Sequence, residues 1–302
     1  MALPPYKTAL QRAWHYSFRG ICGLIFVFLI APLLIVAPLS FNVEPYFSFT
    51  PGMLAFEPEA YSTRWYENIV NLGMVNPDAS YAEGWWKDMW ENAQWIRAIK
   101  NSFFIGIFSA LIATALGTLA ALGLSKPEMP FRAAITGFLI SPMIVPIIVT
   151  ATGMYFFYAT IGIAKTYVGV IVAHATLGVP FVVITVTATL SGFDHNLTRA
   201  ALSLGATPWT AFHKVIMPLI LPGMISGGLF AFVTSFDDVV VMLFLGDLEQ
   251  RTVPRQMWSG IREQISPTIL AVATILVLFS IALLTVAELL RRRSERLQGI
   301  AK

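Results

Sequence analysis

Long stretches without a charged residue constrain this chain more than any other feature. A charge in the middle of a bilayer costs at least ~3 kcal/mol on insertion scales, and a spanning helix needs roughly 20 apolar residues. Six uncharged stretches of the 302-residue sequence reach that length. They predict membrane-spanning helices at about residues 20–40, 101–124, 133–158, 167–190, 219–245 and 267–290.

The composition agrees with an all-α membrane protein. Hydrophobic residues make up 56% of the chain and charged residues only 12%, which is about half the charged share of a soluble domain. The first predicted span is too long for the apolar part of a cleavable signal sequence. We therefore expect residues 20–40 to be a permanent transmembrane helix.

Several motifs of enzymes and cofactor-binding proteins are missing from the sequence. It has no GxxxxGKS or GxxxxGKT loop for nucleotide phosphates, no HExxH, no GxSxG and no cluster of metal ligands. Its single cysteine, Cys22, excludes a disulfide within the chain. We expect no catalytic residue, metal or cofactor on this chain, so energy for any transport would come from another subunit or from an ion gradient.

Basic residues are distributed unevenly between the segments that join the predicted spans. Six spans place both termini on the same side of the membrane, and that side holds 12 of the 20 basic residues but only four acidic ones. The positive-inside rule puts it in the cytoplasm. Residues 1–19 are then a cytoplasmic N-terminal segment, 41–100 an external loop, 101–290 a five-helix core and 291–302 a basic cytoplasmic tail.

Tryptophans are concentrated near the end of the predicted external loop. Trp86 and Trp90 are four residues apart, the spacing of neighbours on a helix. An interfacial helix would place such side chains at the level of the lipid headgroups. A docking surface for an external partner is the alternative, and the two interpretations are compatible.

The cytoplasmic segment between the fourth and fifth predicted spans has strong helix-boundary signals. Asp194 or Asn196 can cap a first short helix, and Gly205 suits the residue just past its end. Thr207 as N-cap and Pro208 as first helical residue then restart a helix. We expect two short helices joined by a tight turn.

The second of these helices would display an apolar stripe. Trp209, Phe212 and Ile216 follow one another at helical spacing, and Pro218 and Pro222 would bend the chain back into the membrane. An exposed apolar stripe on a cytoplasmic segment indicates a protein partner. An ordinary amphipathic linker is the plainer alternative.

This segment resembles the EAA loop of ABC-importer permeases. The resemblance rests on the spacing of Ala200, Ala201, Gly205, Ala206, Phe212, Ile216, Pro218 and Pro222. In that family the loop forms a coupling helix that docks into a groove of an ATPase subunit. By resemblance, the coupling residues within the 195–218 region are Arg199, Ala200, Ala201, Gly205, Ala206, Trp209, Phe212 and Pro218. Arg199 stands where the family usually has an acidic residue.

Residues 235–275 are similar to the polyamine (spermidine/putrescine) branch of the family, and to its second-permease type. The resemblance implies the type I ABC-importer permease (MetI-like) fold in a bacterial inner membrane. It also implies a homologous second permease, two ATPase subunits that bind ATP and Mg, and a periplasmic solute-binding protein. We expect membrane lipid around the chain and no nucleic-acid partner. The implied mechanism is alternating access.

Asp237 and Asp238 are the candidate substrate residues, well inside the fifth predicted span. Carboxylates in a membrane helix face a cavity or a partner, so one of them could attract a cationic substrate. Adjacent helical residues point about 100° apart, so at most one would line the pathway. A structural role between helices is the alternative. His174, alone in the fourth span, is expected to join two helices.

Other substrates and other machinery remain open at this point. The same machinery could carry another small organic cation, an amino-acid derivative or an opine. A secondary transporter would usually have more spans and inverted repeats, and a membrane enzyme would need clustered catalytic residues.

Overall fold

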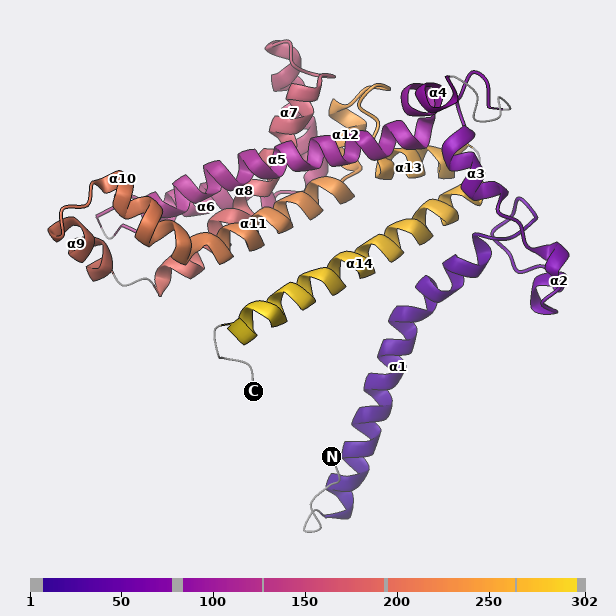
Figure 1. The fold of residues 1–302 in the computed structure, drawn as a ribbon, viewed down its shortest axis with the longest axis horizontal. Helices are drawn as coiled ribbons and strands as arrows, with labels where there is room; N and C mark the ends of the chain where they lie inside the picture. Colours follow the sequence, from indigo (N-terminus) through magenta and orange to yellow (C-terminus); the bar gives the residue numbers. More distant parts are fainter. Residues whose placement is uncertain (1–7, 78–83, 127, 193–194, 264, 298–302) are drawn as a thin grey trace. The chain divides into compact units, whose positions relative to one another are not determined.

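A computed structural model describes residues 8–77, 84–126, 128–192, 195–263 and 265–297 (Figure 1). These residues are mostly helical, and their one β-bridge pairs Asn42 with Tyr61. The chain forms two compact units, one of residues 1–72 and 260–302 and the other of residues 73–259. The first seven residues, the candidate cap Asp194 and residues 298–302 of the predicted tail lie outside the described residues.

The first unit is built on two long helices. Its elements are α1 (Ala9–Leu39), α2 (Pro51–Leu54), the short 3-10 helix η1 (Pro58–Ala60), α3 (Arg64–Asn71) and α14 (Thr268–Leu297). Thr8 and Gln11 form a capping box at the start of α1, so the helix begins well before the predicted span. α14 packs against α1 and α3.

Buried polar contacts hold the segment that follows α1. The Trp65 indole donates to the carbonyl of Asn42 at 2.6 Å, and the hydroxyls of Ser40 and Tyr66 are 2.7 Å apart. The Asn42 side chain donates to the carbonyl of Ser48 at 2.8 Å. These contacts satisfy groups that would otherwise be costly to bury, and they join α3 to the end of α1.

The second unit contains the centre of the predicted five-helix core. Its elements are α4 (Trp85–Asn92), α5 (Gln94–Leu124), α6 (Arg132–Ile144), α7 (Ile147–Thr160), α8 (Tyr167–Ser191), α9 (His195–Ser203), α10 (Pro208–Ala211), the π-helix η2 (Phe212–Ile216), α11 (Met217–Asp237), α12 (Val240–Leu245) and α13 (Val253–Glu263), whose last residues belong to the first unit. α5, α8 and α11 pack along one another, with α9 and α10 at one end and α4 at the other (Figure 1).

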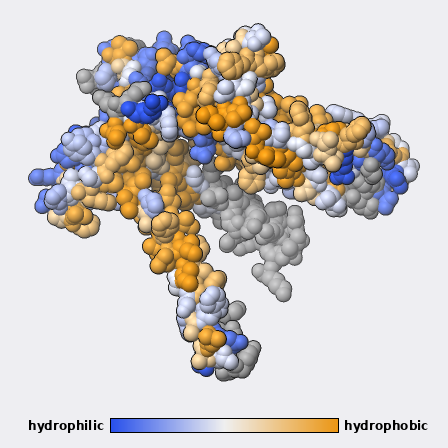
Figure 2. Space-filling view, turned by 180° about the vertical axis from the view of Figure 1, so that it is seen from behind, coloured by the Kyte–Doolittle hydropathy of each residue, from blue (hydrophilic) through white to orange (hydrophobic). Residues whose placement is uncertain are grey.

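Four described helical stretches are long and apolar enough to cross a membrane: α1, α5, α8 and residues 208–237. α6 and α7 pass the same test together, although they are bent by 103° at the break between them. The described apolar part of α14, Thr268–Ala282, is shorter. Three predicted spans thus fall on unbroken helices, the third on a broken pair and the sixth on the described apolar part of α14, while the fifth runs past the end of the 208–237 stretch into α12. Figure 2 shows that hydrophobic residues cover much of the surface of α1 and of the bundle of α5, α8 and α11 on the side seen there.

The third predicted span, at 133–158, is not one straight helix. Pro142 lies inside α6, and Pro146 directly precedes α7. Proline lacks the amide hydrogen of a helical residue and disfavours helical backbone in the residue before it. Val145 accordingly has an extended backbone, with φ −72° and ψ 134°, and the span breaks there.

Glycines allow α5, α8 and α11 to approach closely. A Cβ on Gly117 would lie 2.6 Å from the Cβ of Val182, and one on Gly178 would lie 2.8 Å from the Cβ of Ala231. Membrane helices commonly pack through small residues because these admit close backbone contact. The buried side chains around this three-helix contact are Ala113, Ala121, Val182, Val186, Leu190, Ile220 and Ala231.

Gly227→Leu is expected to destabilise this three-helix contact strongly. A Cβ at Gly227 would already contact the Thr185 hydroxyl and lie 2.7 Å from the Cα of Val182, and backbone cannot move aside as a side-chain end can. Overpacking costs about 1–3 kcal/mol. We expect a lower thermal midpoint and a lower yield of monodisperse protein in detergent. Gly153→Leu, where a Cβ meets open space, is the control and should behave as wild type; equal stability of the two variants would contradict the packing.

Candidate functional site

The turn predicted between the fourth and fifth spans is present. Gly205 has φ +83°, a left-handed conformation that glycine adopts without strain. Its amide donates to the carbonyl of Leu202 at 3.0 Å, and the amide of Ala206 donates to the carbonyl of Ala201 at 3.1 Å. This pair of bonds is a Schellman motif. It confirms that Gly205 ends the first short helix, α9.

The start of the next helix is also as predicted. Thr207 has an extended backbone, its hydroxyl accepts a hydrogen bond from the Thr210 amide at 3.2 Å, and Pro208 occupies the first turn. The four donors at a helix start need such partners. The α9–α10 connection is therefore ordered by local hydrogen bonds.

The prediction that this second helix is short is wrong. α10, η2 and α11 form one helical stretch from Pro208 to Asp237. The π-turn closes with a bond from the Met217 amide to the Phe212 carbonyl. It directly precedes Pro218, which has no amide hydrogen to donate, so the helix continues through the position where the sequence predicted a bend.

Apolar side chains are exposed around this turn. The exposed fractions are 88% for Leu204 and 72% for Trp209, with 47% and 44% for Leu197 and Leu202. We call these four side chains the α9–α10 surface. The Trp209 ring lies against His213, with 4.0 Å between ring centroids.

The other predicted coupling residues lie on or beside the α9–α10 surface. Arg199, Ala200 and Pro218 are exposed, and Phe212 is half-buried with its ring centroid 6.3 Å from that of Trp209. The structure therefore gathers the predicted coupling residues at one end of the three-helix bundle (Figure 1).

Asp237 and Asp238 differ from the prediction, which placed both within one continuous helix. α11 ends at Asp237, Asp238 has an extended backbone with φ −73° and ψ 129°, and α12 begins at Val240. An Asp side chain competes with helical hydrogen bonding by capping nearby amides. Here the Asp238 carboxylate accepts a bond from the Met242 amide at 3.3 Å, so it caps α12.

Asp238 also belongs to a buried polar chain between helices. Its carboxylate lies 3.6 Å from Nε2 of His174 on α8, and Nδ1 of His174 lies 2.7 Å from the hydroxyl of Ser235 on α11. Asp238 is 8% exposed, Ser235 4% and His174 1%. The expectation that His174 joins two helices is confirmed. Asp237, in contrast, is exposed, so the two acids have different surroundings.

A polar cluster at the other end of the bundle escaped the sequence analysis. The buried Asn101 amide group donates to the carbonyls of Glu249 at 2.7 Å and Arg251 at 3.0 Å, and its oxygen accepts from the Tyr167 hydroxyl at 2.9 Å. Its partners lie far apart in sequence, so no local pattern marks it. Beside it is a cavity of about 260 Å³ lined by Gln94, Arg97, Ala98, Asn101, Leu248, Arg251 and Gln256.

The tryptophans of the predicted external loop lie on α4, where Trp86 is 63% and Trp90 56% exposed. Lys100 lies over the Trp90 ring at 4.4 Å. Amides from Asn76, Asn92 and Val75 bond to the Asp88 carboxylate and hold its pKa below the ordinary value. Exposure of the two tryptophans fits both an interfacial helix and a docking surface.

Comparison with known proteins identifies the family. A family described as the binding-protein-dependent transport system inner membrane component matches residues 113–297, more than half of the chain. The chain belongs to this family. It is a multi-pass membrane permease component of a binding-protein-dependent transporter, and the matched range includes the α9–α10 surface and both acids of the α11–α12 break.

Individual relatives agree with this membership. The chain is 30% identical over 271 residues to the spermidine/putrescine transport system permease protein PotC of Haemophilus influenzae, covering 90% of this chain and 95% of that protein. It is 28% identical over 260 residues to the putrescine transport system permease protein PotI of Escherichia coli, covering 83% and 82%.

A solved structure supports the fold. The permease matches a chain of a bacterial ABC transporter involved in the import of the acidic polysaccharide alginate, with a TM-score of 0.66, over 96% of this chain and 99% of that chain. At 14% identity, the match concerns the fold alone. It confirms the predicted all-α, type I ABC-importer permease fold.

Proposed function

We propose that this permease forms half of the membrane pathway of an ATP-driven importer of polyamines such as spermidine and putrescine. The observation that carries the proposal is the 30% identity to a spermidine/putrescine permease over 90% of the chain. The proposed setting is a bacterial inner membrane, with both termini in the cytoplasm. The permease itself is not an enzyme and binds no cofactor.

The proposed partners divide the work of transport. A periplasmic solute-binding protein delivers the substrate to the outer side, and a homologous second permease completes the pathway. Two ATPase subunits hold ATP and Mg. Support for this arrangement comes from the family and from the absence of a phosphate-binding loop in the sequence.

We infer that the α9–α10 surface is the contact with the ATPase. Its four apolar side chains are exposed, and exposed apolar patches mark interaction sites. The helical stretch from Pro208 to Asp237 has 30 residues and therefore spans about 45 Å. It connects the α9–α10 surface directly to the α11–α12 break, so movement of the ATPase would reach Asp237 through one rigid element.

We infer different roles for the two acids. Asp237 is exposed and is the acid that would attract a cationic substrate in the pathway. Asp238 is buried against His174 and caps α12, so its role is to hold the break in place. Arg199 is exposed beside the α9–α10 surface and would meet an acidic group of the ATPase.

The test is to purify the tagged permease with its associated subunits and reconstitute the complex in proteoliposomes. We expect an ATPase and a second membrane protein to copurify. Spermidine-loaded binding protein should raise ATP hydrolysis severalfold and drive uptake of labelled spermidine. Stimulation by another organic cation, an amino-acid derivative or an opine, but not by polyamines, would change the substrate class. Uptake by the permease alone, driven by an ion gradient, would indicate a secondary transporter.

A further inference from the structure

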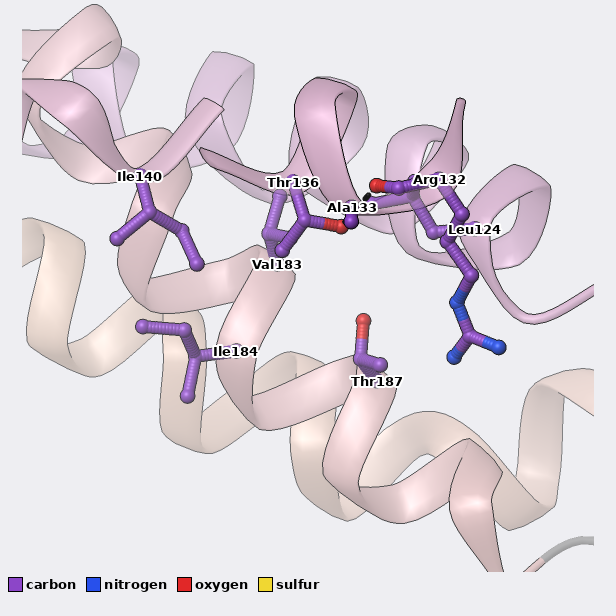
Figure 3. A pocket seen from close by; sticks show the side chains of 8 residues that line it. All are labelled: Leu124, Arg132, Ala133, Thr136, Ile140, Val183, Ile184 and Thr187. Carbon is purple, nitrogen blue, oxygen red and sulfur yellow. Dashed lines mark hydrogen bonds between the residues drawn. The ribbon is translucent and has the colours of Figure 1, made fainter. Parts of the chain in front are cut away.

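A groove lies between the beginning of α6 and the second half of α8 (Figure 3). Its volume is about 590 Å³. The side chains that line it are Leu124, Arg132, Ala133, Thr136, Ile140, Val183, Ile184 and Thr187. Most of this lining is aliphatic, and the few polar groups gather at one end.

Those polar groups are suited to an anionic, oxygen-rich ligand. The Arg132 guanidinium and the Thr187 hydroxyl point into the same opening (Figure 3). In the part of the chain that the structure describes, no carboxylate lies within ion-pair distance of Arg132, and the buried Thr187 hydroxyl has no hydrogen-bond partner. The Thr136 hydroxyl donates to the Arg132 carbonyl at 2.8 Å, which leaves its oxygen able to accept.

The polar end of the groove lies at a predicted membrane boundary. Arg132 is the first residue of α6, and the uncharged stretch of the third span follows it. The positive-inside rule predicts that the basic residues near it face the cytoplasm. Anionic lipids of the cytoplasmic leaflet attract basic groups at that depth, while an aliphatic groove deeper in the bilayer accommodates hydrocarbon.

We propose that this groove binds one anionic phospholipid. The phosphate pairs with Arg132, the ester oxygens meet the Thr187 hydroxyl, and an acyl chain lies along Ile140 and Ile184. Charge complementarity favours this occupant: in the described residues no carboxylate of this chain lies within ion-pair distance of the Arg132 guanidinium, which would repel a cationic substrate. A helix of the second permease is the competing occupant.

The experiment uses the complete complex in nanodiscs that contain phosphatidylglycerol with a photoreactive acyl chain. Labelled peptides are mapped by mass spectrometry. We expect label on α6 and α8, and at least a fivefold loss of that label in Arg132→Gln. Arg132→Lys should retain most of it, because the charge remains. Arg19→Gln, which removes an arginine at the start of another predicted span, is the control and should leave the label unchanged.

A second variant fills the groove while keeping the charge. Ala133 is exposed on the groove wall, and Ala133→Phe should reduce the label on α6 and α8 at least threefold. Unlabelled phosphatidylglycerol should compete with the probe, and phosphatidylcholine should not. Equal labelling of Arg132→Gln and wild type would overturn the proposal, as would crosslinks showing a helix of the second permease in the groove. Lipid labelling is measured without transport, so failure here leaves the proposed function untouched.

Discussion

Asp238→Leu is expected to remove most of the folded permease from the membrane, whereas Asp237→Leu should leave its amount unchanged. Loss of the Asp238 carboxylate takes away the acceptor of the Met242 amide and the acid 3.6 Å from His174. A buried polar group left without a partner costs about 1–3 kcal/mol, and the Met242 amide is the group that loses its hydrogen bond, since Nε2 of His174 has no hydrogen-bond partner in the wild type. We therefore expect a loss of about 1–3 kcal/mol in stability, seen as a lower thermal midpoint in detergent.

The neighbouring acid provides the matched control, because Asp237 is exposed and its replacement leaves no buried group unsatisfied. Asp238→Asn should recover part of the stability, since asparagine can still accept a bond at the cap.

Asp237→Asn, in a normally assembled complex, should lower polyamine uptake at least about tenfold if that carboxylate attracts the cation. Equal stability of the two leucine variants would refute the structural role of Asp238, and unchanged uptake in Asp237→Asn would remove the pathway role.

Trp209→Asp is expected to abolish stimulated ATP hydrolysis while the permease remains folded. Trp209 is 72% exposed, so a charge there costs the isolated chain little. In an ATPase groove, the substitution would bury a carboxylate without a partner. It would also remove the aromatic ring that we expect at the centre of the contact. We expect at least a tenfold fall in stimulated hydrolysis, or release of the ATPase during purification.

The same measurement with Leu54→Asp controls for a general effect of surface charge. Leu54 is 68% exposed and belongs to the predicted external loop, so its replacement should leave stimulation intact. Gly205→Val tests the turn itself, because φ +83° strains a β-branched residue. Normal stimulation in both Trp209→Asp and Gly205→Val would exclude the α9–α10 surface as the ATPase contact.

Local chemistry explains what could be predicted from the sequence. The uncharged stretches identified the membrane segments because a charge in hydrocarbon is costly wherever it occurs. Gly205 and Thr207 identified the turn because a left-handed residue and an N-cap depend on neighbours only a few positions away. The predicted coupling residues, which rest on the resemblance to the EAA loop, lie in that same short segment.

The break between α11 and α12 depends on contacts that no local pattern records. Asp238 leaves the helix where its carboxylate meets His174 on α8 and the amide of Met242, and hydropathy alone predicted a continuous span there. The polar cluster likewise depends on a distant partner, because the Asn101 side chain donates to the carbonyl of Glu249, far along the sequence.

The sequence by itself thus determined the membrane class, the approximate spans and the turn between α9 and α10 of this permease. Only the tertiary structure distinguished an exposed Asp237 from a buried Asp238, continued the helix that begins at Pro208 into α11, and formed the groove beside Arg132. The physical reason is that burial and pairing of a polar group are set by the helices packed around it, and adjacent residues of one type can meet different helices.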